Sequence, residues 1–177
     1  MKIEKSWILA IAVLVVAISL PTHGALAYGD ETQFQFVITL APAPAASSTA
    51  EDGSRISFTG TGTFKPEDPE EVTGGGTWET RDNSGNVTGG GSWLATRLVK
   101  FDLAPGAVAD PAIRAGLAFL QITYSDGAKG ILAASCHLPG SPSSVAEGII
   151  ASKDFTLYGG HVHAGPTFFR VLAENED

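Results

Sequence analysis

The sequence predicts an all-β protein, either a small antiparallel β-barrel or a strongly coiled meander of about eight strands. Two observations favour this fold. Apolar and polar residues alternate along much of the chain, and a glycine-rich motif recurs on consecutive predicted strands. The composition agrees, because 21 glycines and 10 prolines among 177 residues are more than a helical bundle usually carries.

The first 27 residues have the three parts of a secretory signal peptide. A short, weakly basic head precedes the apolar run 7–20, and Ala25-Leu26-Ala27 offers small residues at both positions that a signal peptidase reads. The apolar run is shorter than the roughly 20 residues that cross the hydrocarbon core of a membrane. We therefore expect cleavage after Ala27, a secreted or periplasmic protein, and no stable membrane anchor after cleavage.

Charge and cysteine content limit the partners of the remaining domain, residues 28–177. The chain has 11 Lys and Arg against 19 Asp and Glu, a net charge of −8, so nucleic acid is not an expected partner. Cys136 is the single cysteine, which excludes an internal disulfide and a CxxC redox pair. A domain of this length can bury a core without such cross-links. The sequence leaves the oligomeric state open.

The first predicted strands follow from period-two patterns. Apolar residues alternate with polar ones over 34–40, and residues 56–64 place isoleucine, phenylalanine and glycine on one face. Between them, residues 41–54 begin with alanines and prolines and are expected to form a flexible loop. The acidic segment 66–71 is expected to be a solvated turn.

The second half of the chain predicts four further strands. Ser125-Asp126-Gly127 supplies turn residues for a hairpin between the first two of them. The four predicted strands are residues 116–124, 130–138, 145–152 and 167–172. Residues 110–116 offer a helical turn with Pro111 at its first position, and 173–177 are expected to be a frayed acidic tail.

The most informative feature is an internal repeat. The heptapeptide VTGGGTW at 72–78 recurs as VTGGGSW at 87–93, and a looser copy, TGTGTF, occupies 59–64. A phosphate-binding loop would require a helix after the glycines, whereas strand-forming residues follow them here. The repeat therefore predicts neighbouring strands rather than a nucleotide site.

A hairpin between the second and third copies sets a definite register. With Ser84-Gly85 as a two-residue turn, paired residues have numbers that sum to 169, so that Trp78 faces Gly91 and Trp93 faces Gly76. An indole over a glycine recovers buried area and permits the sharp coiling that closes a barrel.

Parts of the chain resemble known families. The Gly-x-Trp tripeptides at 76–78 and 91–93 resemble the lipocalin motif, which in that family belongs to the first strand. The glycine–aromatic pattern of 59–93 resembles the barrels of dirigent proteins and allene oxide cyclases, and a segment at 161–166 resembles part of a CHRD domain. None of the functional residues of the barrel families can be matched, so the likeness implies only a barrel of calycin or allene oxide cyclase size.

A pair of histidines is the sharpest polar feature. On a strand, His161 and His163 would point to the same face and could reach one metal ion. His137 or Cys136 could supply a third ligand, but not both, because neighbours on a strand point to opposite faces. Such a set would suit Zn²⁺ or copper. The alternative is two histidines in a turn, since glycines and a proline flank them.

Binding of a small apolar or amphipathic ligand inside the barrel is the leading functional hypothesis. Aromatic side chains would line the site, namely Trp78, Trp93, Phe119 and Tyr124. The alternatives are a metal-binding protein, a barrel cyclase or isomerase, and a structural envelope or adhesion domain. The absence of a recognisable catalytic motif or spaced carboxylate pair favours a protein without enzymatic activity, although the sequence leaves this open.

Overall fold

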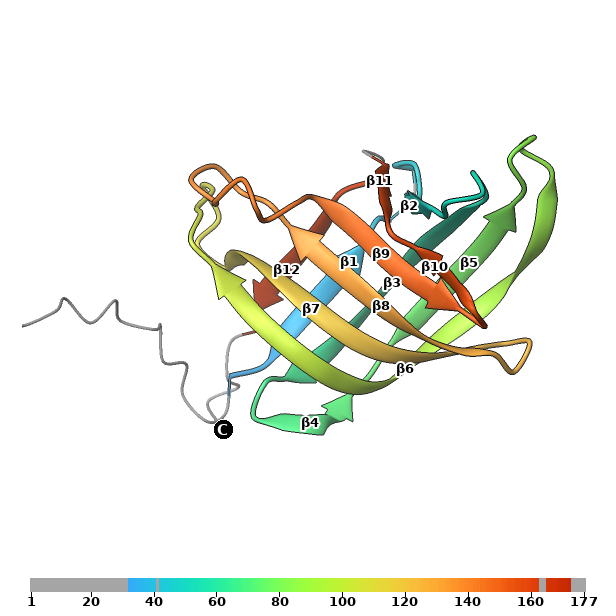
Figure 1. The fold of residues 1–177 in the computed structure, drawn as a ribbon. Coiled ribbons are helices and arrows are strands. Elements are labelled where there is room, and N and C mark those ends of the chain that lie inside the picture. The colour runs from blue at the N-terminus through green and yellow to red at the C-terminus, as the bar shows by residue number, and fades with distance from the viewer. Residues whose placement is uncertain (1–31, 41, 163–164, 173–177) are drawn as a thin grey trace, which may run out of the picture.

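The computed structural model of the chain describes residues 32–40, 42–162 and 165–172, so the predicted signal peptide and acidic tail lie outside it. Within these residues the protein is all-β, as predicted, with twelve strands joined in one sheet whose pairs are antiparallel (Figure 1). No helix occurs in the described part of the chain, and hence none long and apolar enough to cross a membrane.

The number of strands exceeds the predicted eight because four short strands, of three to five residues each, form in segments that were not predicted to be strands. In chain order the strands are β1 (Phe34–Ile38), β2 (Ala46–Thr49), β3 (Arg55–Lys65), β4 (Asp68–Val72), β5 (Gly75–Arg81), β6 (Val87–Ala104), β7 (Ile113–Tyr124), β8 (Lys129–Cys136), β9 (Gly148–Lys153), β10 (Thr156–Tyr158), β11 (Gly160–Val162) and β12 (Thr167–Val171). The first strand ends at Ile38 rather than at Leu40, since Thr39 has a positive φ of 41° and Leu40 is exposed.

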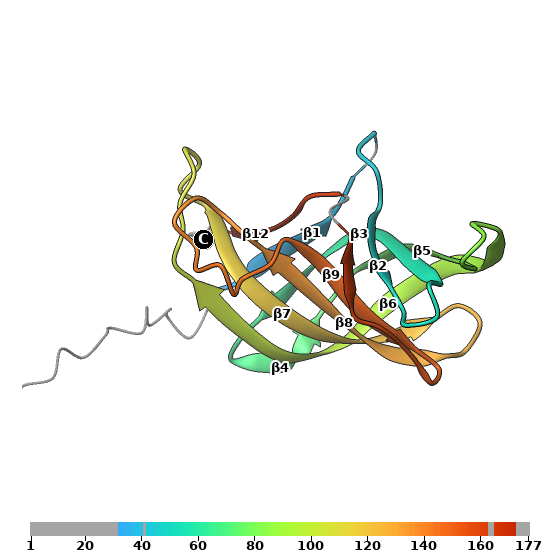
Figure 2. The same cartoon turned by 45° about the horizontal axis from the view of Figure 1, so that its top comes forward.

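The sheet is long and strongly curved. Its order is β10-β9-β8-β7-β12-β1-β3-β2-β11; β5 also pairs with β3 and β6, β6 with β7, and β4 with β3. In Figures 1 and 2, β7, β8 and β9 lie across from β1 and β3, so that the two parts of the sheet enclose the core.

The predicted register of the glycine-rich repeat is confirmed. Trp78 pairs with Gly91 and Gly76 pairs with Trp93 between β5 and β6. The first, looser copy joins the same array, because Gly60 of β3 pairs with Gly76. All three copies of the repeat therefore lie side by side on neighbouring strands.

The turn of this hairpin is wider than predicted. The amide of Asp82 donates to the carbonyl of Asn86, and Gly85 has a φ of 87°, the left-handed conformation that glycine adopts without strain. Near Thr80 and Arg81, the pairing of β5 with β6 shifts by one residue. This bulge takes up the extra residue of the wider turn, so the two Trp–Gly pairs still form as predicted.

Two predicted loops contain strands. Residues 46–49, inside the expected flexible loop 41–54, form β2, which pairs with β3 and β11. Residues 68–71 of the expected acidic turn form β4 together with Val72, and among the described strands β4 pairs with β3. The small buried side chains of Ala46 and Ser47 give no period-two pattern, and Pro69 of β4 is tolerated because that strand lies at an edge.

The predicted helical turn at 110–116 is also wrong. The side-chain Oδ1 of Asp110 accepts a hydrogen bond from the amide of Ala112 at 2.9 Å, and β7 begins at Ile113. An aspartate before proline thus forms a side-chain-closed turn that leads directly into a strand. The β7–β8 hairpin, by contrast, forms at Ser125-Asp126-Gly127 as predicted.

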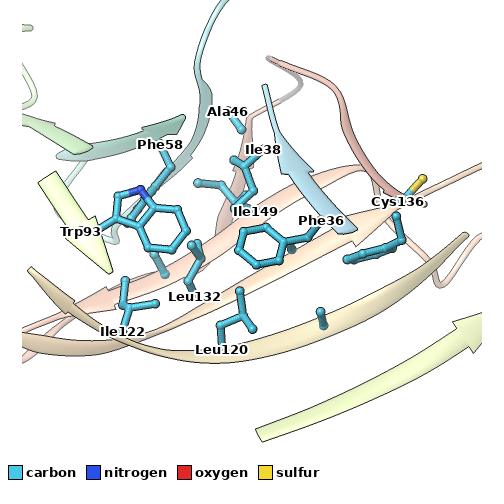
Figure 3. Close-up of a cluster of buried hydrophobic side chains, with 14 of the residues drawn as sticks. Phe36, Ile38, Ala46, Phe58, Trp93, Leu120, Ile122, Leu132, Cys136 and Ile149 are labelled. Carbon is cyan, nitrogen blue, oxygen red and sulfur yellow. The ribbon is translucent and has the colours of Figure 1, made fainter. Parts of the chain in front are cut away.

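Aromatic rings fill the interior between the two parts of the sheet. The Phe34 and Phe101 rings are 4.8 Å apart, Phe64 and Phe101 also 4.8 Å, and Phe101 and Phe169 5.1 Å. Figure 3 shows the neighbouring part of the core, where side chains from β1, β3, β7 and β8 point toward one another. Burial and close packing of these rings stabilise the fold.

Candidate functional site

Three of the four predicted ligand-binding residues come together in the core. The rings of Trp78 and Tyr124 are 5.3 Å apart, and Phe58 lies between Trp93, at 5.8 Å, and Tyr124, at 6.1 Å. All three predicted residues are buried. Within the core these rings pack against one another and against Phe58. Trp78 and Phe58 also line a separate hollow of about 570 Å³ beside β3, β5 and β6.

Their polar atoms already have partners. The indole N–H of Trp78 donates to the carbonyl of Ser92, that of Trp93 donates to Thr59, and the Tyr124 hydroxyl donates to Ser152, at 2.8–3.0 Å. Burial, as the main cause, raises the pKa of Tyr124 far above its usual value. These residues therefore act as satisfied core side chains.

Phe119, the fourth predicted residue, lies on the other face of β7. Its neighbours Ala118 and Leu120 are buried in the core, whereas Phe119 is half-buried and pairs with Lys100 on β6 and Ala133 on β8. Strand alternation thus separates it from the other three residues.

A lysine covers one end of this aromatic cluster. The ammonium of Lys153 lies 4.9 Å from the ring centre of Trp78 and 5.4 Å from that of Tyr124, and it contacts Asp126 at 2.7 Å and Asp154 at 3.1 Å. Burial alone would lower the pKa of Lys153, but hydrogen bonds to the two carboxylates outweigh it and raise the pKa. The cation closes the interior at the end where β9 turns into β10.

The predicted metal ligands are only partly within the described residues. The backbone of His161 lies in β11, where it pairs with Ser48, but its side chain and all of His163 lie outside what the structure describes. Among the described side chains, no three His, Cys, Asp or Glu gather in a group that could hold a metal ion.

Cys136 and His137 occupy different environments. Cys136 lies at the edge of the core (Figure 3), and burial, helped by the charge of Glu147, raises the pKa of its thiol to about 12. His137 is exposed, and its ring Nδ1 lies 2.7 Å from the carbonyl of Val145. A buried thiol with a raised pKa stays protonated at neutral pH and is a poor nucleophile.

An open hollow of about 520 Å³ lies at the opposite end of β7 and β8 from Lys153. It is bounded by the end of β8, the starts of β7 and β12, and the loops 105–112 and 139–147. Its lining is mainly apolar, with a small polar group, and consists of Val108, Ile113, Cys136, His137, Leu138, Glu147, Gly165, Pro166, Thr167 and Phe168. An apolar hollow with a few polar atoms is typical of a small-molecule site.

Glu147 organises the wall of this hollow. Its Oε2 accepts a hydrogen bond from the amide of His137, and its Oε1 accepts one from the amide of Thr167, both at 2.7 Å. One carboxylate thus joins the end of β8 to the start of β12. No sequence pattern indicated this role, because Glu147 is a single acidic residue in a polar loop.

The two loops at the rim support each other. Ser141 Oγ donates to the carbonyl of Pro105 at 2.7 Å, and the amide of Ala107 donates to the carbonyl of Pro139 at 3.1 Å. Gly140, with a φ of 91°, provides the turn that brings Ser141 back to Leu138. These hydrogen bonds join the two loops to each other at the rim of the hollow.

The chain is thus an all-β protein with one curved antiparallel sheet, a packed aromatic interior and an apolar hollow at one end. The chain matches no family model, no curated protein and no solved structure.

Proposed function

We propose that the protein is an exported β-barrel that binds a small apolar or amphipathic ligand in the hollow beside β8 and β12. The observation that carries this proposal is the hollow itself. Its volume of about 520 Å³ falls within the range of known ligand pockets, and Ile113, Leu138 and Phe168 give it apolar walls.

The strand pairing supports a closed barrel. β1 pairs with β3, β3 with β5, β5 with β6, β6 with β7, β7 with β12, and β12 again with β1. A sheet that returns to its first strand has no free edge along that circuit, and a barrel of this kind offers a ligand site at its mouth.

The proposed site differs from the aromatic cluster predicted from the sequence. Trp78, Trp93 and Tyr124 fill the space between the strands, and Lys153 covers Trp78 and Tyr124. A ligand there would have to displace packed rings, whereas the hollow at the other end needs no rearrangement. Export rests on the leader at 1–27, and a carrier or receptor outside the cytoplasm is the role that fits both features.

Binding of the neutral, apolar dye Nile red tests the proposal. We expect saturable binding with a rise in fluorescence, because the dye moves from water to an apolar wall. Val108, which lines the hollow and is 40% exposed, can be enlarged without disturbing the core. Val108→Trp should fill the hollow and weaken dye binding at least tenfold.

The matched control is Val87→Trp, since Val87 is exposed at the start of β6, on no wall of the hollow. It should bind the dye like the parent protein. Equal weakening by both variants, or undiminished binding by Val108→Trp, would contradict the proposed site. If the dye binds as expected, native mass spectrometry of protein from its natural host would identify a ligand that co-purifies.

A further inference from the structure

We propose that the hollow selects a ligand whose polar end donates hydrogen bonds, above all a protonated amine, over a ligand that ends in a carboxylate. This inference rests on the proposed function, because it names the class of ligand that the same hollow would hold. It follows from an inventory of the polar atoms on the wall.

The described part of the wall offers mainly hydrogen-bond acceptors. No lysine or arginine is among the described residues that line the hollow, while Glu147 places a carboxylate there. The hydroxyl of Thr167 lies within hydrogen-bond distance of the Ser135 carbonyl and of Glu147, so its single proton is already used. An anionic head would therefore meet a like charge and find no partner for it.

Glu147 keeps capacity for a ligand. An ionised carboxylate has about four acceptor sites, and the structure fills three at most, with the amides of His137 and Thr167 and the Thr167 hydroxyl. Both amides also hold the carboxylate in a fixed position on the wall. At least one lone pair thus remains for an ammonium or hydroxyl group, and an ammonium forms the stronger, charge-assisted bond.

His137 adds to the same preference. Its Nδ1 faces the carbonyl of Val145, which can only accept, so Nδ1 carries a proton. When the ring is neutral, Nε2 is an acceptor. Together with the apolar walls formed by Ile113, Leu138 and Phe168, these atoms complement an amphipathic molecule with a short apolar body and a donor head.

Three ligands of equal chain length test this directly: octylamine, 1-octanol and octanoate, titrated calorimetrically into the purified protein near neutral pH. Octylamine is protonated there, like a lysine side chain. We expect it to bind at least tenfold more tightly than octanoate, with octanol between them. This ranking is measured on the unchanged protein, so it does not depend on whether any variant folds.

A variant then assigns the preference to Glu147. Glu147→Gln removes the charge but keeps an acceptor, and it should bring octylamine to within about threefold of octanol. Glu67→Gln is the matched control, because it makes the same change in net charge at an exposed position in the turn before β4. It should leave the preference for octylamine unchanged.

The outcomes separate the two proposals. Octanoate binding as tightly as octylamine would overturn the selection for a donor head and leave the hollow as a ligand site. An octylamine preference that Glu147→Gln leaves intact would also overturn it. Failure of all three compounds to bind at millimolar concentration, together with failure of Nile red, would overturn the proposed function itself.

Discussion

The glycines of the repeat position the indole ring of Trp93. In the sheet, Gly60, Gly76 and Trp93 form one row across β3, β5 and β6, so the indole extends over Gly76 toward β3. A Cβ on Gly60 would come within 2.7 Å of the indole, and the indole N–H donates to the carbonyl of Thr59. The glycines of the repeat leave the space that this side chain fills.

Removing the Trp93 side chain should therefore be costly. Trp93→Ala leaves a cavity between Phe36 and Phe58, and we expect a loss of about 3–5 kcal/mol in the free energy of unfolding. Urea denaturation followed by circular dichroism measures it. Phe155→Ala is the control, because the Phe155 side chain is fully exposed, and it should leave the free energy of unfolding nearly unchanged. An unchanged midpoint for Trp93→Ala would mean that the indole is not buried.

At the residue scale, burial could be predicted and polar partnerships could not. The repeat identified Trp78 and Trp93 as packed across a hairpin, because a local pattern of glycine and aromatic residues carried the information. Glu147 and Lys153 were not found, since their partners come from other parts of the chain. Glu147 meets Thr167 and Lys153 meets Trp78 only after the sheet has formed.

At the scale of elements, the β3–β5–β6 array depends on close approach of its backbones. A Cβ on Gly76 would lie 1.8 Å from the carbonyl oxygen of Thr59, whereas one on Gly90 would come no closer than 3.3 Å to the carbonyl of Trp78. The glycines of one repeat are thus not equivalent, although the sequence makes them look so.

This difference predicts the effect of two alanine substitutions. Gly76→Ala should destabilise the protein by about 1–3 kcal/mol or more, because β3 and β5 must separate to admit the methyl group. Gly90→Ala should change stability by about 1 kcal/mol at most. Thermal unfolding of the two variants decides the matter, and equal melting temperatures would show that the backbones are not in contact at Gly76.

Asp82 in the β5–β6 turn should make the free energy of unfolding depend on pH in the acid range. Asp82 accepts hydrogen bonds from the side chain and amide of Asn86 and from the amide of Ser84, and these bonds lower its pKa below 3.8. A lowered pKa means that its contribution is present above the pKa of the unfolded chain and is lost as pH falls through the folded value.

Asp82→Asn should therefore lower stability at neutral pH and flatten the decline of stability below about pH 4. Urea midpoints measured across this range, with Glu67→Gln for comparison, provide the test. If the urea midpoint of Asp82→Asn falls as steeply below pH 4 as that of the parent protein, other carboxylates dominate the loss of stability in acid.

The elements that could be predicted are those with a clear alternation or repeat. The register of the central hairpin followed from matching copies, and the β7–β8 hairpin from its turn residues. β2 and β4 were missed because small residues and an acidic, proline-containing segment lack an apolar face. They form strands because the backbone of each pairs with β3.

At the scale of the whole molecule, the two ends of the interior differ. One end is closed by Lys153 with Asp126 and Asp154 over the aromatic rings, and the other opens into the hollow between loops 105–112 and 139–147. The sequence predicted an aromatic interior and assigned the ligand to it. The space that remains open is set by how the strand ends and loops meet, which no local pattern encodes.

The most direct test of the proposed site is a titration of isotope-labelled protein with 1-octanol, followed by NMR. A neutral ligand keeps this test independent of the preference for a donor head. We predict that the amide resonances of Leu138, Thr167 and Phe168 shift with increasing octanol, while the indole N–H resonances of Trp78 and Trp93 stay in place. Shifts of the indole resonances with the three amides unmoved would put the ligand in the aromatic interior and contradict the account.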